Sequence, residues 1–142
     1  MKVSILISNY NKEKYIEECI LSVLNQDYKN LEIIVFDNNS SDNSLKIINK
    51  FSDKIIIKRK NRMSESGATN QIDLIIDSFE ISSGDIICLL DGDDYFLPNK
   101  VSHIKDIFLK NNNLDVVFDV PTILANNEFR PLKIKKKYNR EI

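Results

Sequence analysis

Three carboxylates stand within four positions of the segment "CLLDGDDYFLP", residues 88–98. Asp91, Asp93 and Asp94 follow an apolar run, and no basic residue neighbours them in sequence. Carboxylates this close repel one another unless a cation lies between them. The two carboxylates of a D-x-D turn can approach one hard divalent cation, and Gly92 permits a tight backbone there. We therefore expect Asp93 and Asp91 to bind Mg²⁺ or Mn²⁺, with the remaining ligands supplied by water and a substrate diphosphate.

The alternative for this segment is an ordinary solvated turn, because aspartate is frequent in turns. The D-x-D pattern alone does not decide between the two interpretations. For Asp94 a structural role is favoured, either capping the following turn or holding Asp93 in place.

Two further polar clusters follow apolar runs: "SNYN" at residues 8–11 and "DNNSSD" at residues 37–42. Asp37 leads the second cluster and can accept hydrogen bonds from a ribose or a base, while Tyr10 can stack on a base. The alternatives are a plain Asx-type turn with a helix cap for the second cluster, and a partly buried loop aromatic for Tyr10. Asp42 is assigned to the turn.

The apolar runs alternate with helical patterns along the chain. Strands are expected at residues 3–8, 31–37, 54–58, 85–91 and 114–120, with four helices between them and a hairpin about Asn126 and Asn127. This order predicts an α/β fold with a mainly parallel sheet and helices on both faces. Ligands of such sheets bind beyond the carboxyl ends of the strands. All three polar clusters fall at that edge, which favours the metal interpretation.

Several elements carry more specific predictions. Asn11 is expected to cap the first helix, and Ser41 or Asp42 the second. The third helix should turn Ile72, Ile75, Ile76 and Phe79 inward, because these residues have i, i+3, i+4, i+7 spacing. Gly84 should end that helix, and the strand at 85–91 should be central because it is apolar on both faces.

Composition predicts one domain over residues 1–142, with a core at 1–120 and a hairpin and basic tail at 121–142. The net charge of −1 argues against a nucleic-acid partner. Basic runs at 54–62 and 133–140 are either solvated or attracted to phosphates or an anionic membrane face.

Cys19 and Cys88 lie far apart in apolar contexts, so we expect two buried free thiols in a reducing compartment. No run is long enough to span a membrane, and a cytoplasmic protein is expected, with contact at the inner membrane face left open. His103, the single histidine, is expected to be structural or exposed. The chain lacks a glycine-rich phosphate loop and a Ser-His-Asp set, which leaves a metal as the diphosphate anchor.

Two long segments together resemble family 2 glycosyltransferases of the GT-A fold. "VSILISNYNKEKYIEECILSVLNQDYKNLEIIVFDNNSSDNS" is similar to the strand, T/S-x-Y-N turn, helix and "hEhhhVDDGSxD" opening of that family, h being apolar. "SSGDIICLLDGDDYFLPNKV" is similar to its "A-x-G-[DE]-h-h-x-h-L-D-x-D-D-x-h-x-P-x-K-h" segment. The resemblance covers residues 3 to 120 in order and spacing.

The resemblance implies transfer of a sugar from a UDP-, dTDP- or GDP-linked donor to a saccharide or lipid-linked acceptor, in bacterial surface polysaccharide synthesis. It implies a donor nucleotide site made by Ser8, Asn9, Tyr10, Asp37, Asn38, Asp91 and Gly92. Asp91 would lie near the ribose and the metal, and Asp93 would be the main metal ligand.

Three departures from the family pattern matter. Asn38 and Asn39 replace the second acidic residue and the glycine of the "DDG" turn, so the choice of nucleoside stays open. An arginine common near the start of the third helix is absent around Thr69 and Asn70, and Lys60 or Arg62 is a substitute source of positive charge.

The third departure is length: the resemblance implies a fold truncated on its C-terminal side, without an identifiable general base. Asp119 and Glu128 are acidic but lie in no recognisable base motif. The alternative to an active enzyme is therefore a donor-binding module without turnover, or one part of a split enzyme, acting with a partner subunit or as a homo-oligomer. A sugar nucleotidyltransferase is disfavoured, since "SNYNKEKY" contains no glycine.

Overall fold

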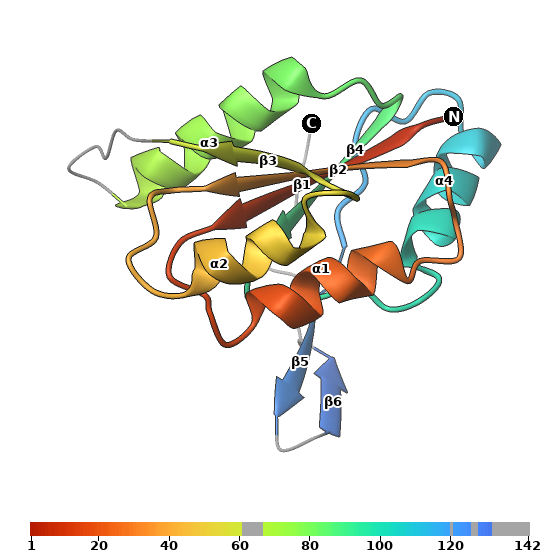
Figure 1. Ribbon diagram of the computed structural model, residues 1–142. Coiled ribbons are helices and arrows are strands. Elements are labelled where there is room, and N and C mark those ends of the chain that lie inside the picture. Colours follow the sequence, from red (N-terminus) through yellow and green to blue (C-terminus); the bar gives the residue numbers. More distant parts are fainter. Residues whose placement is uncertain (61–66, 120, 126–127, 132–142) are drawn as a thin grey trace. The chain divides into compact units, whose positions relative to one another are not determined.

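The computed structural model describes residues 1–60, 67–119, 121–125 and 128–131. Two compact units are present, Met1–Lys110 and Asn111–Ile142. The first unit contains every candidate site residue. Its four strands are β1 (Val3–Asn9), β2 (Leu31–Asp37), β3 (Ile56–Arg59) and β4 (Ile86–Asp91). They form a wholly parallel sheet in the order β3-β2-β1-β4, as shown in Figure 1.

Helices cover both faces of this sheet (Figure 1). They are α1 (Ile16–Leu24), α2 (Ser44–Ile48) with the short 3₁₀ helix η1 (Asn49–Phe51), α3 (Gly67–Ile81) and α4 (Lys100–Lys110). Each helix follows a strand, and parallel neighbours require such crossover connections. The predicted fold class, an α/β parallel sheet with helices on both faces, is confirmed.

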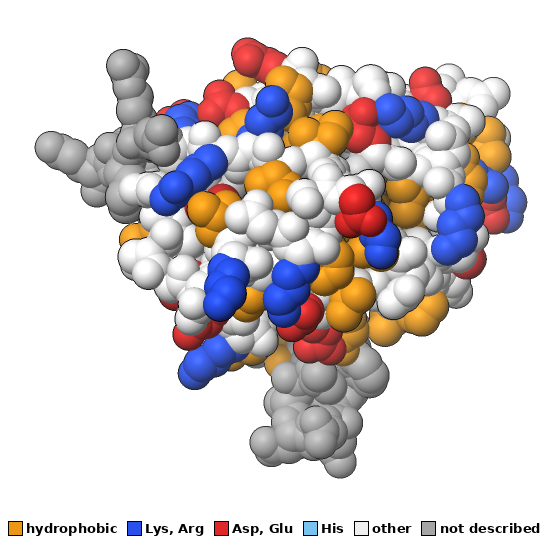
Figure 2. Space-filling view, in the orientation of Figure 1, with side chains coloured by type: hydrophobic (Ala, Val, Ile, Leu, Met, Phe, Trp, Pro, Cys, Tyr) orange, Lys and Arg blue, Asp and Glu red, His pale blue; other side chains and the backbone are white. Residues whose placement is uncertain are grey.

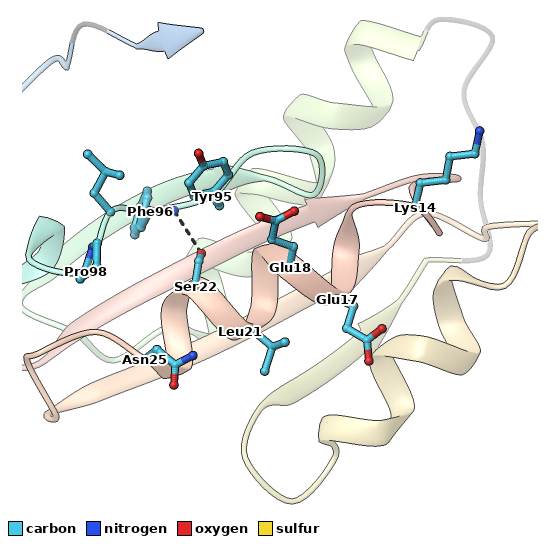
Figure 3. A pocket seen from close by; sticks show the side chains of 10 residues that line it. Lys14, Glu17, Glu18, Leu21, Ser22, Asn25, Tyr95, Phe96 and Pro98 are labelled. Carbon is cyan, nitrogen blue, oxygen red and sulfur yellow. Dashed lines mark hydrogen bonds between the residues drawn. The ribbon is translucent and has the colours of Figure 1, made fainter. Parts of the chain in front are cut away.

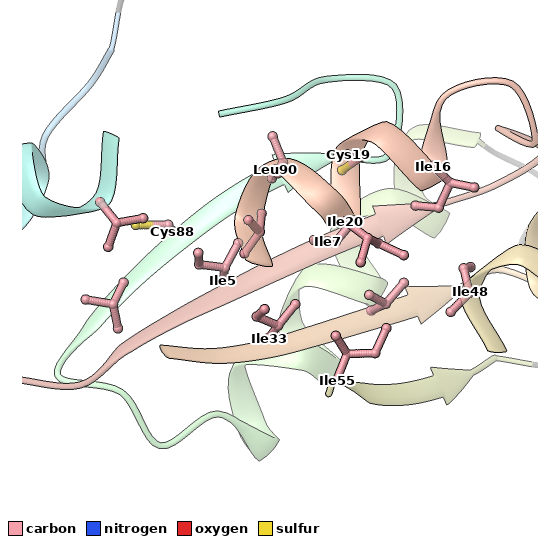
Figure 4. Close-up of a cluster of buried hydrophobic side chains, with 14 of the residues drawn as sticks. Ile5, Ile7, Ile16, Cys19, Ile20, Ile33, Ile48, Ile55, Cys88 and Leu90 are labelled. Atoms are coloured by element: carbon pink, nitrogen blue, oxygen red, sulfur yellow. The ribbon is translucent and has the colours of Figure 1, made fainter. Parts of the chain in front are cut away.

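Alternating side chains of the strands build two cores. On one face Ile5, Ile7 and Val35 pack against α1 residues such as Ile16 and Ile20, which are all fully buried (Figure 4). Val101 of α4 and Ile48 of α2 join the same cluster. The buried side of α1 is formed by Ile16, Cys19, Ile20 and Val23, whereas Tyr15, just before the helix, is 51% exposed.

The two cysteines are free and buried in this core, as predicted. Burial raises the pKa of the Cys19 thiol to about 12 and that of Cys88 to about 11. The histidine prediction also holds, because His103 is exposed on α4.

The smaller core lies under α3 and corrects the predicted orientation of that helix. Leu74 and Ser78, one helical turn apart, are buried, and Leu74 packs with Leu6, Ile34 and Phe36. Ile72, Ile76 and Phe79 are instead 50–60% exposed. The helix carries apolar residues on more than one face, and the sheet surface decides which of them is covered.

Gly84 does not end α3, which stops at Ile81. A Cβ at Gly84 would lie 2.5 Å from the Ser4 backbone nitrogen, so glycine is needed because the chain passes tightly against β1. The prediction of a central strand at 85–91 is also wrong within the described residues. β4 pairs only with β1 there, and Leu89 is 55% exposed.

The second unit contains an antiparallel pair, β5 (Thr122–Ala125) and β6 (Glu128–Pro131). Ala125 is opposite Glu128, so the predicted hairpin is confirmed by its strands, although Asn126 and Asn127 themselves lie outside the described residues. The strand predicted at 114–120 is wrong: residues 114–119 form no strand, and Phe118 is 93% exposed. An apolar β-branched run forms a strand only where a neighbour completes its hydrogen bonds.

Candidate functional site

The register of the sheet brings the polar clusters together. Asn9 is opposite Asp37 on one side of β1, and Ser8 is opposite Asp91 on the other. Ser8 Oγ donates a hydrogen bond to Asp91 Oδ1 at 2.9 Å, and Asn9 Nδ2 donates to Asp37 Oδ1 at 2.8 Å. The carboxyl ends of β1, β2 and β4 therefore form one connected polar edge.

Asp37 organises the loop after β2. Its side chain has no exposed surface and accepts hydrogen bonds from Asn9 Nδ2, Ser40 N at 2.9 Å and Ser40 Oγ at 2.5 Å. Arg59 Nε lies 4.0 Å from Asp37 Oδ2. The carboxylate therefore positions the loop in this structure, and its direct contact with a nucleoside remains a prediction.

Asn38 presents a buried acceptor beside this network. Its side chain is 4% exposed, and its Oδ1 has no hydrogen-bond partner among the described residues. A buried polar atom left unpaired costs about 1–3 kcal/mol. A ligand that donates a hydrogen bond here would remove that cost.

Arg59 is a site candidate that the sequence reasoning missed. It ends β3 in register with Asp37, and its Nη2 donates to Asn39 Oδ1 at 2.6 Å. A signal for Arg59 was available in the basic run at residues 54–62. This run contains the third predicted strand, which ends at the same edge of the sheet. Lys60 was predicted to replace the positive charge of the family's arginine. Its Nζ instead forms ion pairs with two carboxylates of α3, Asp77 Oδ2 at 2.8 Å and Asp73 Oδ2 at 3.6 Å. Arg62 lies outside the described residues.

The loop after β1 is fastened to the loop after β2. Asn11 Oδ1 accepts from Ser41 N at 2.8 Å and does not cap α1, whose N-cap residue Tyr15 makes no side-chain capping bond. Asp42 accepts from Ser44 N at 2.9 Å at the start of α2, in keeping with its predicted turn role, but the N-cap residue of α2 is Asn43 rather than the predicted Ser41 or Asp42.

Asp42 also accepts from Glu13 N at 3.0 Å, which joins the two loops again. Burial raises the pKa of Asp42, but its hydrogen bonds with Ser44 and Glu13 outweigh burial and lower it. Tyr10, at the tip of the first loop, is 44% exposed and open to stacking.

The acidic turn is shaped by a close approach between backbones. Gly92 N donates to Ser8 O at 2.9 Å, and a Cβ on Gly92 would lie 2.9 Å from Asn9 Oδ1. Gly92 does not have a positive φ, so glycine is favoured here by the limited space beside Asn9 and Ser8 rather than by a left-handed turn. Asp94 N donates to Asp91 O at 2.9 Å and closes the turn.

The carboxylates of this turn repel one another. Asp91, Asp93 and Asp94 are exposed in this structure. Partial desolvation of its carboxyl group raises the pKa of Asp94, and the charges of Asp93 and Asp91 raise it further. The turn therefore gathers the three carboxyl groups in the way that the sequence predicted.

Lys12 supplies a cation from a distant part of the chain. Its Nζ lies 2.5 Å from Asp93 Oδ2. The hydrogen bond with Asp93 raises the pKa of Lys12, and the charges of Asp93 and Asp91 add to this against a smaller opposing effect of burial. Sequence inspection missed this pair because the residues are 81 positions apart, although Lys12 directly follows the "SNYN" cluster.

The acidic turn fits a divalent metal in part. Asp91 and Asp93 offer exposed carboxylate oxygens, which are the ligands that Mg²⁺ and Mn²⁺ prefer. No three His, Cys, Asp or Glu residues of the described chain form a group able to hold a metal. An ion at Asp93 would therefore draw its other ligands from water and a bound anion, as Mg²⁺ commonly does.

A groove of about 590 Å³ runs between α1 and residues 95–98 (Figure 3). None of the predicted site residues lines this groove. However, α1, which forms one wall, binds the segment that follows the acidic turn. Ser22 Oγ of α1 accepts a hydrogen bond from Phe96 N at 3.1 Å.

On the face drawn in Figure 2, basic side chains are interspersed with acidic and uncharged ones. No helix in the described part of the chain is both long and apolar enough to cross a bilayer.

The profile of the family described as Glycosyl transferase family 2 matches residues 4–142. The chain belongs to this family. The Escherichia coli protein named UDP-Glc:alpha-D-GlcNAc-diphosphoundecaprenol beta-1,3-glucosyltransferase WfaP is 40% identical over 103 residues, covering 71% of this chain and 39% of that protein. The chain spans between 39% and 47% of the length of the first curated relatives that it matches.

Solved structures of the GT-A fold match as well. S. aureus TarS 1-349 in complex with UDP-GlcNAc superposes with a TM-score of 0.67 at 25% identity, covering 79% of this chain and 32% of that one. The mannosyltransferase PcManGT of Pyrobaculum calidifontis, solved with GDP-Man and Mn²⁺, has a TM-score of 0.61 over 75% of this chain and 31% of its own. At 18% identity the second likeness establishes the fold alone. Both matches agree with the GT-A fold expected from the sequence.

Proposed function

We propose that this chain binds the nucleotide diphosphate sugar of a family 2 glycosyltransferase that transfers the sugar to an acceptor hydroxyl in bacterial surface polysaccharide synthesis. The observation that carries the proposal is the joining of the ends of β1, β2 and β4 by the Ser8–Asp91 and Asn9–Asp37 hydrogen bonds. Bound UDP-GlcNAc in the TarS structure and the UDP-Glc donor in the name of WfaP support the substrate class.

The nucleoside half of the donor is assigned to β1 and β2. The exposed ring of Tyr10 offers a surface for stacking, and Asn38 Oδ1, which has no partner among the described residues, offers an acceptor for a donor group of the base. Uracil, thymine and guanine all carry a ring N–H that suits such an acceptor. Asp37 and Asn9 act here by holding the loop that presents Asn38.

The diphosphate half is assigned to the acidic turn. Asp93 and Asp91 would hold Mg²⁺ or Mn²⁺, which when bound neutralises charge that builds on the departing diphosphate. Ser8 orients the Asp91 carboxylate through its 2.9 Å hydrogen bond, and Gly92 lets the turn approach β1. The PcManGT structure with GDP-Man and Mn²⁺ is a fold-level parallel for this assignment.

The acceptor site is not assigned to any residue of this chain, which spans 39% to 47% of the length of the first curated relatives. A lipid-linked acceptor stands in the name of WfaP, which supports an acceptor of that kind. No residue of this chain is assigned as the general base. Asp119 and Glu128 belong to the second unit and remain without a role.

Thermal unfolding with nucleotide diphosphates tests this function. UDP, dTDP and GDP are each added with and without Mn²⁺, and at least one should raise the melting temperature in a Mn²⁺-dependent way. Asp93→Asn should abolish the Mn²⁺-dependent part of the increase in melting temperature. Asp53→Asn, which removes the same charge from an exposed residue before β3 at the opposite sheet edge, should leave it unchanged. Absence of any shift in the unaltered protein would refute the proposed function.

A further inference from the structure

The ion pair between Lys12 and Asp93 has no part in the function proposed above. Lys12 Nζ contacts the oxygen of the residue assigned as the main metal ligand, at 2.5 Å. The origin of the lysine side chain is fixed, because Lys12 N donates to Ser44 Oγ at 2.9 Å. The ammonium therefore lies at the acidic turn as a consequence of how the first two loops are joined.

The contact excludes simultaneous use of the same oxygen by a metal. Mg²⁺ binds carboxylate oxygens at about 2.1 Å, so an ion on Asp93 Oδ2 would compete with the ammonium for one position. An ammonium and a divalent cation that close also repel each other strongly. Lys12 must leave Asp93 before an ion can use this oxygen.

We propose that Lys12 is a tethered counter-ion of Asp93 which exchanges with the divalent cation when the donor diphosphate arrives, so that metal and nucleotide bind together. This inference rests on the proposed donor site. Without nucleotide, displaced Lys12 loses its anionic partner, which weakens metal binding. With nucleotide, the flexible lysine stem can carry the ammonium to a phosphate oxygen, and both cations then have partners.

The coupling must be reciprocal, because both ligands act on one equilibrium. Mn²⁺ should strengthen nucleotide binding by the same factor by which nucleotide strengthens Mn²⁺ binding. Lys12 contributes to this factor because it lowers the affinity for Mn²⁺ when no nucleotide is bound.

Mn²⁺ binding, measured by the electron paramagnetic resonance signal of the free ion, tests the proposal with and without UDP. Without UDP, Lys12→Met should bind Mn²⁺ about fivefold more tightly than the unaltered protein, the factor expected for the strongest exposed ion pairs. The strengthening of Mn²⁺ binding by UDP should be correspondingly smaller in this variant.

Two variants control for charge and for folding. Lys14→Met removes the same charge from an exposed lysine two residues away and should behave as the unaltered protein. Lys12→Arg keeps a cation at the turn and should retain weak Mn²⁺ binding in the absence of UDP. Melting temperatures of all four proteins are compared first, and the Lys12→Met protein should gain more stability from Mn²⁺ than the others.

The outcomes separate this inference from the function on which it rests. Equal Mn²⁺ affinity of Lys12→Met and the unaltered protein, with UDP still enhancing both, would overturn the exchange role of Lys12 alone. Failure of UDP to enhance Mn²⁺ binding in the unaltered protein and in every variant would overturn the proposed donor site together with this inference.

Discussion

Asparagine side chains hold the loops at the carboxyl edge of the sheet. Asn9 is buried and joins β1 to Asp37, while Asn11 reaches across to Ser41 N. Asn11 and Asn39 have φ values of 52° and 57°, in the left-handed region that asparagine tolerates better than most residues. Asn39 thus adopts a backbone conformation that glycine also favours, at the position where the family pattern has glycine, and its Oδ1 accepts a hydrogen bond from Arg59.

Substitution of Asn39 separates its backbone role from its side-chain role. Asn39→Ala and Asn39→Gly both lose the bond with Arg59, but only alanine resists the positive φ. We expect Asn39→Ala to be less stable than Asn39→Gly by about 1 kcal/mol. Equilibrium urea unfolding measures the difference, and equal stabilities would show that the left-handed backbone is not retained in solution.

At this scale the sequence predicted the acidic turn and the polar clusters, because each of them directly follows an apolar run that reads as a strand of a parallel sheet. It did not predict that Asp37 is wholly buried, or that Lys12 and Arg59 join the site. Those contacts link residues from different loops, and a linear sequence contains no direct signal for such pairs.

Among the elements, α3 shows how a helix with apolar residues on two faces is oriented. Its i, i+3, i+4, i+7 pattern predicts that Ile72, Ile76 and Phe79 face the core, but Leu74 and Ser78 do so. Leu74 packs with Leu6, Ile34 and Phe36 of the sheet. Periodicity identifies the helix, and the packing surface selects the face.

Truncation of one residue from each face of α3 tests this orientation. Leu74→Ala removes a side chain that is 2% exposed and should destabilise the protein by about 2–5 kcal/mol. Phe79→Ala removes a larger side chain that is 60% exposed and should cost less than about 1 kcal/mol. Thermal and urea unfolding compare the two variants, and a larger loss for Phe79→Ala would support the orientation predicted from the sequence.

Across the first unit as a whole, the two edges of the sheet have different tasks. The carboxyl edge carries the candidate site, whereas the amino edge is tied by Glu32. This carboxylate accepts hydrogen bonds from Lys2 Nζ at 2.6 Å, Ser4 Oγ at 2.6 Å and Ser83 N at 2.8 Å. It therefore joins β2 to β1 and to the segment that leads into β4.

Glu32 should make the stability of the protein depend on pH in the acid range. Burial raises the pKa of Glu32, but hydrogen bonds from Lys2, Ser4 and Ser83 outweigh it and lower the pKa from 4.5 to about 2. As the pH falls, Glu32 is therefore protonated at a higher pH in the unfolded chain than in the folded protein. The contribution is complete above about pH 4.5 and is lost as the pH falls to about 2.

Glu32→Gln should remove this part of the acid dependence, which amounts to about 3 kcal/mol. Urea unfolding between pH 6 and pH 2 gives the free energy of unfolding at each pH, and the variant should show the flatter profile. Glu18→Gln changes an exposed glutamate on α1 and serves as the control. Parallel profiles for Glu32→Gln and the unaltered protein would refute the role of Glu32.

The sequence by itself determined the parallel α/β fold and the edge of the sheet that carries the polar clusters. Both follow from local signals: apolar periodicity defines the strands and helices, and their alternation requires parallel pairing. It also determined the free thiols and the hairpin, which depend on composition and on neighbouring residues.

The tertiary structure alone decided which residues meet at that edge. β4 pairs beside β1, so Ser8 reaches Asp91, and the joined loops deliver Lys12 to Asp93. It also decided that Gly84 passes too close to the Ser4 backbone to carry a side chain, rather than ending a helix, and that Gly92 lies against Ser8 and Asn9. The physical reason is that these contacts join segments up to 83 residues apart, and only the packed sheet brings such segments within hydrogen-bonding distance.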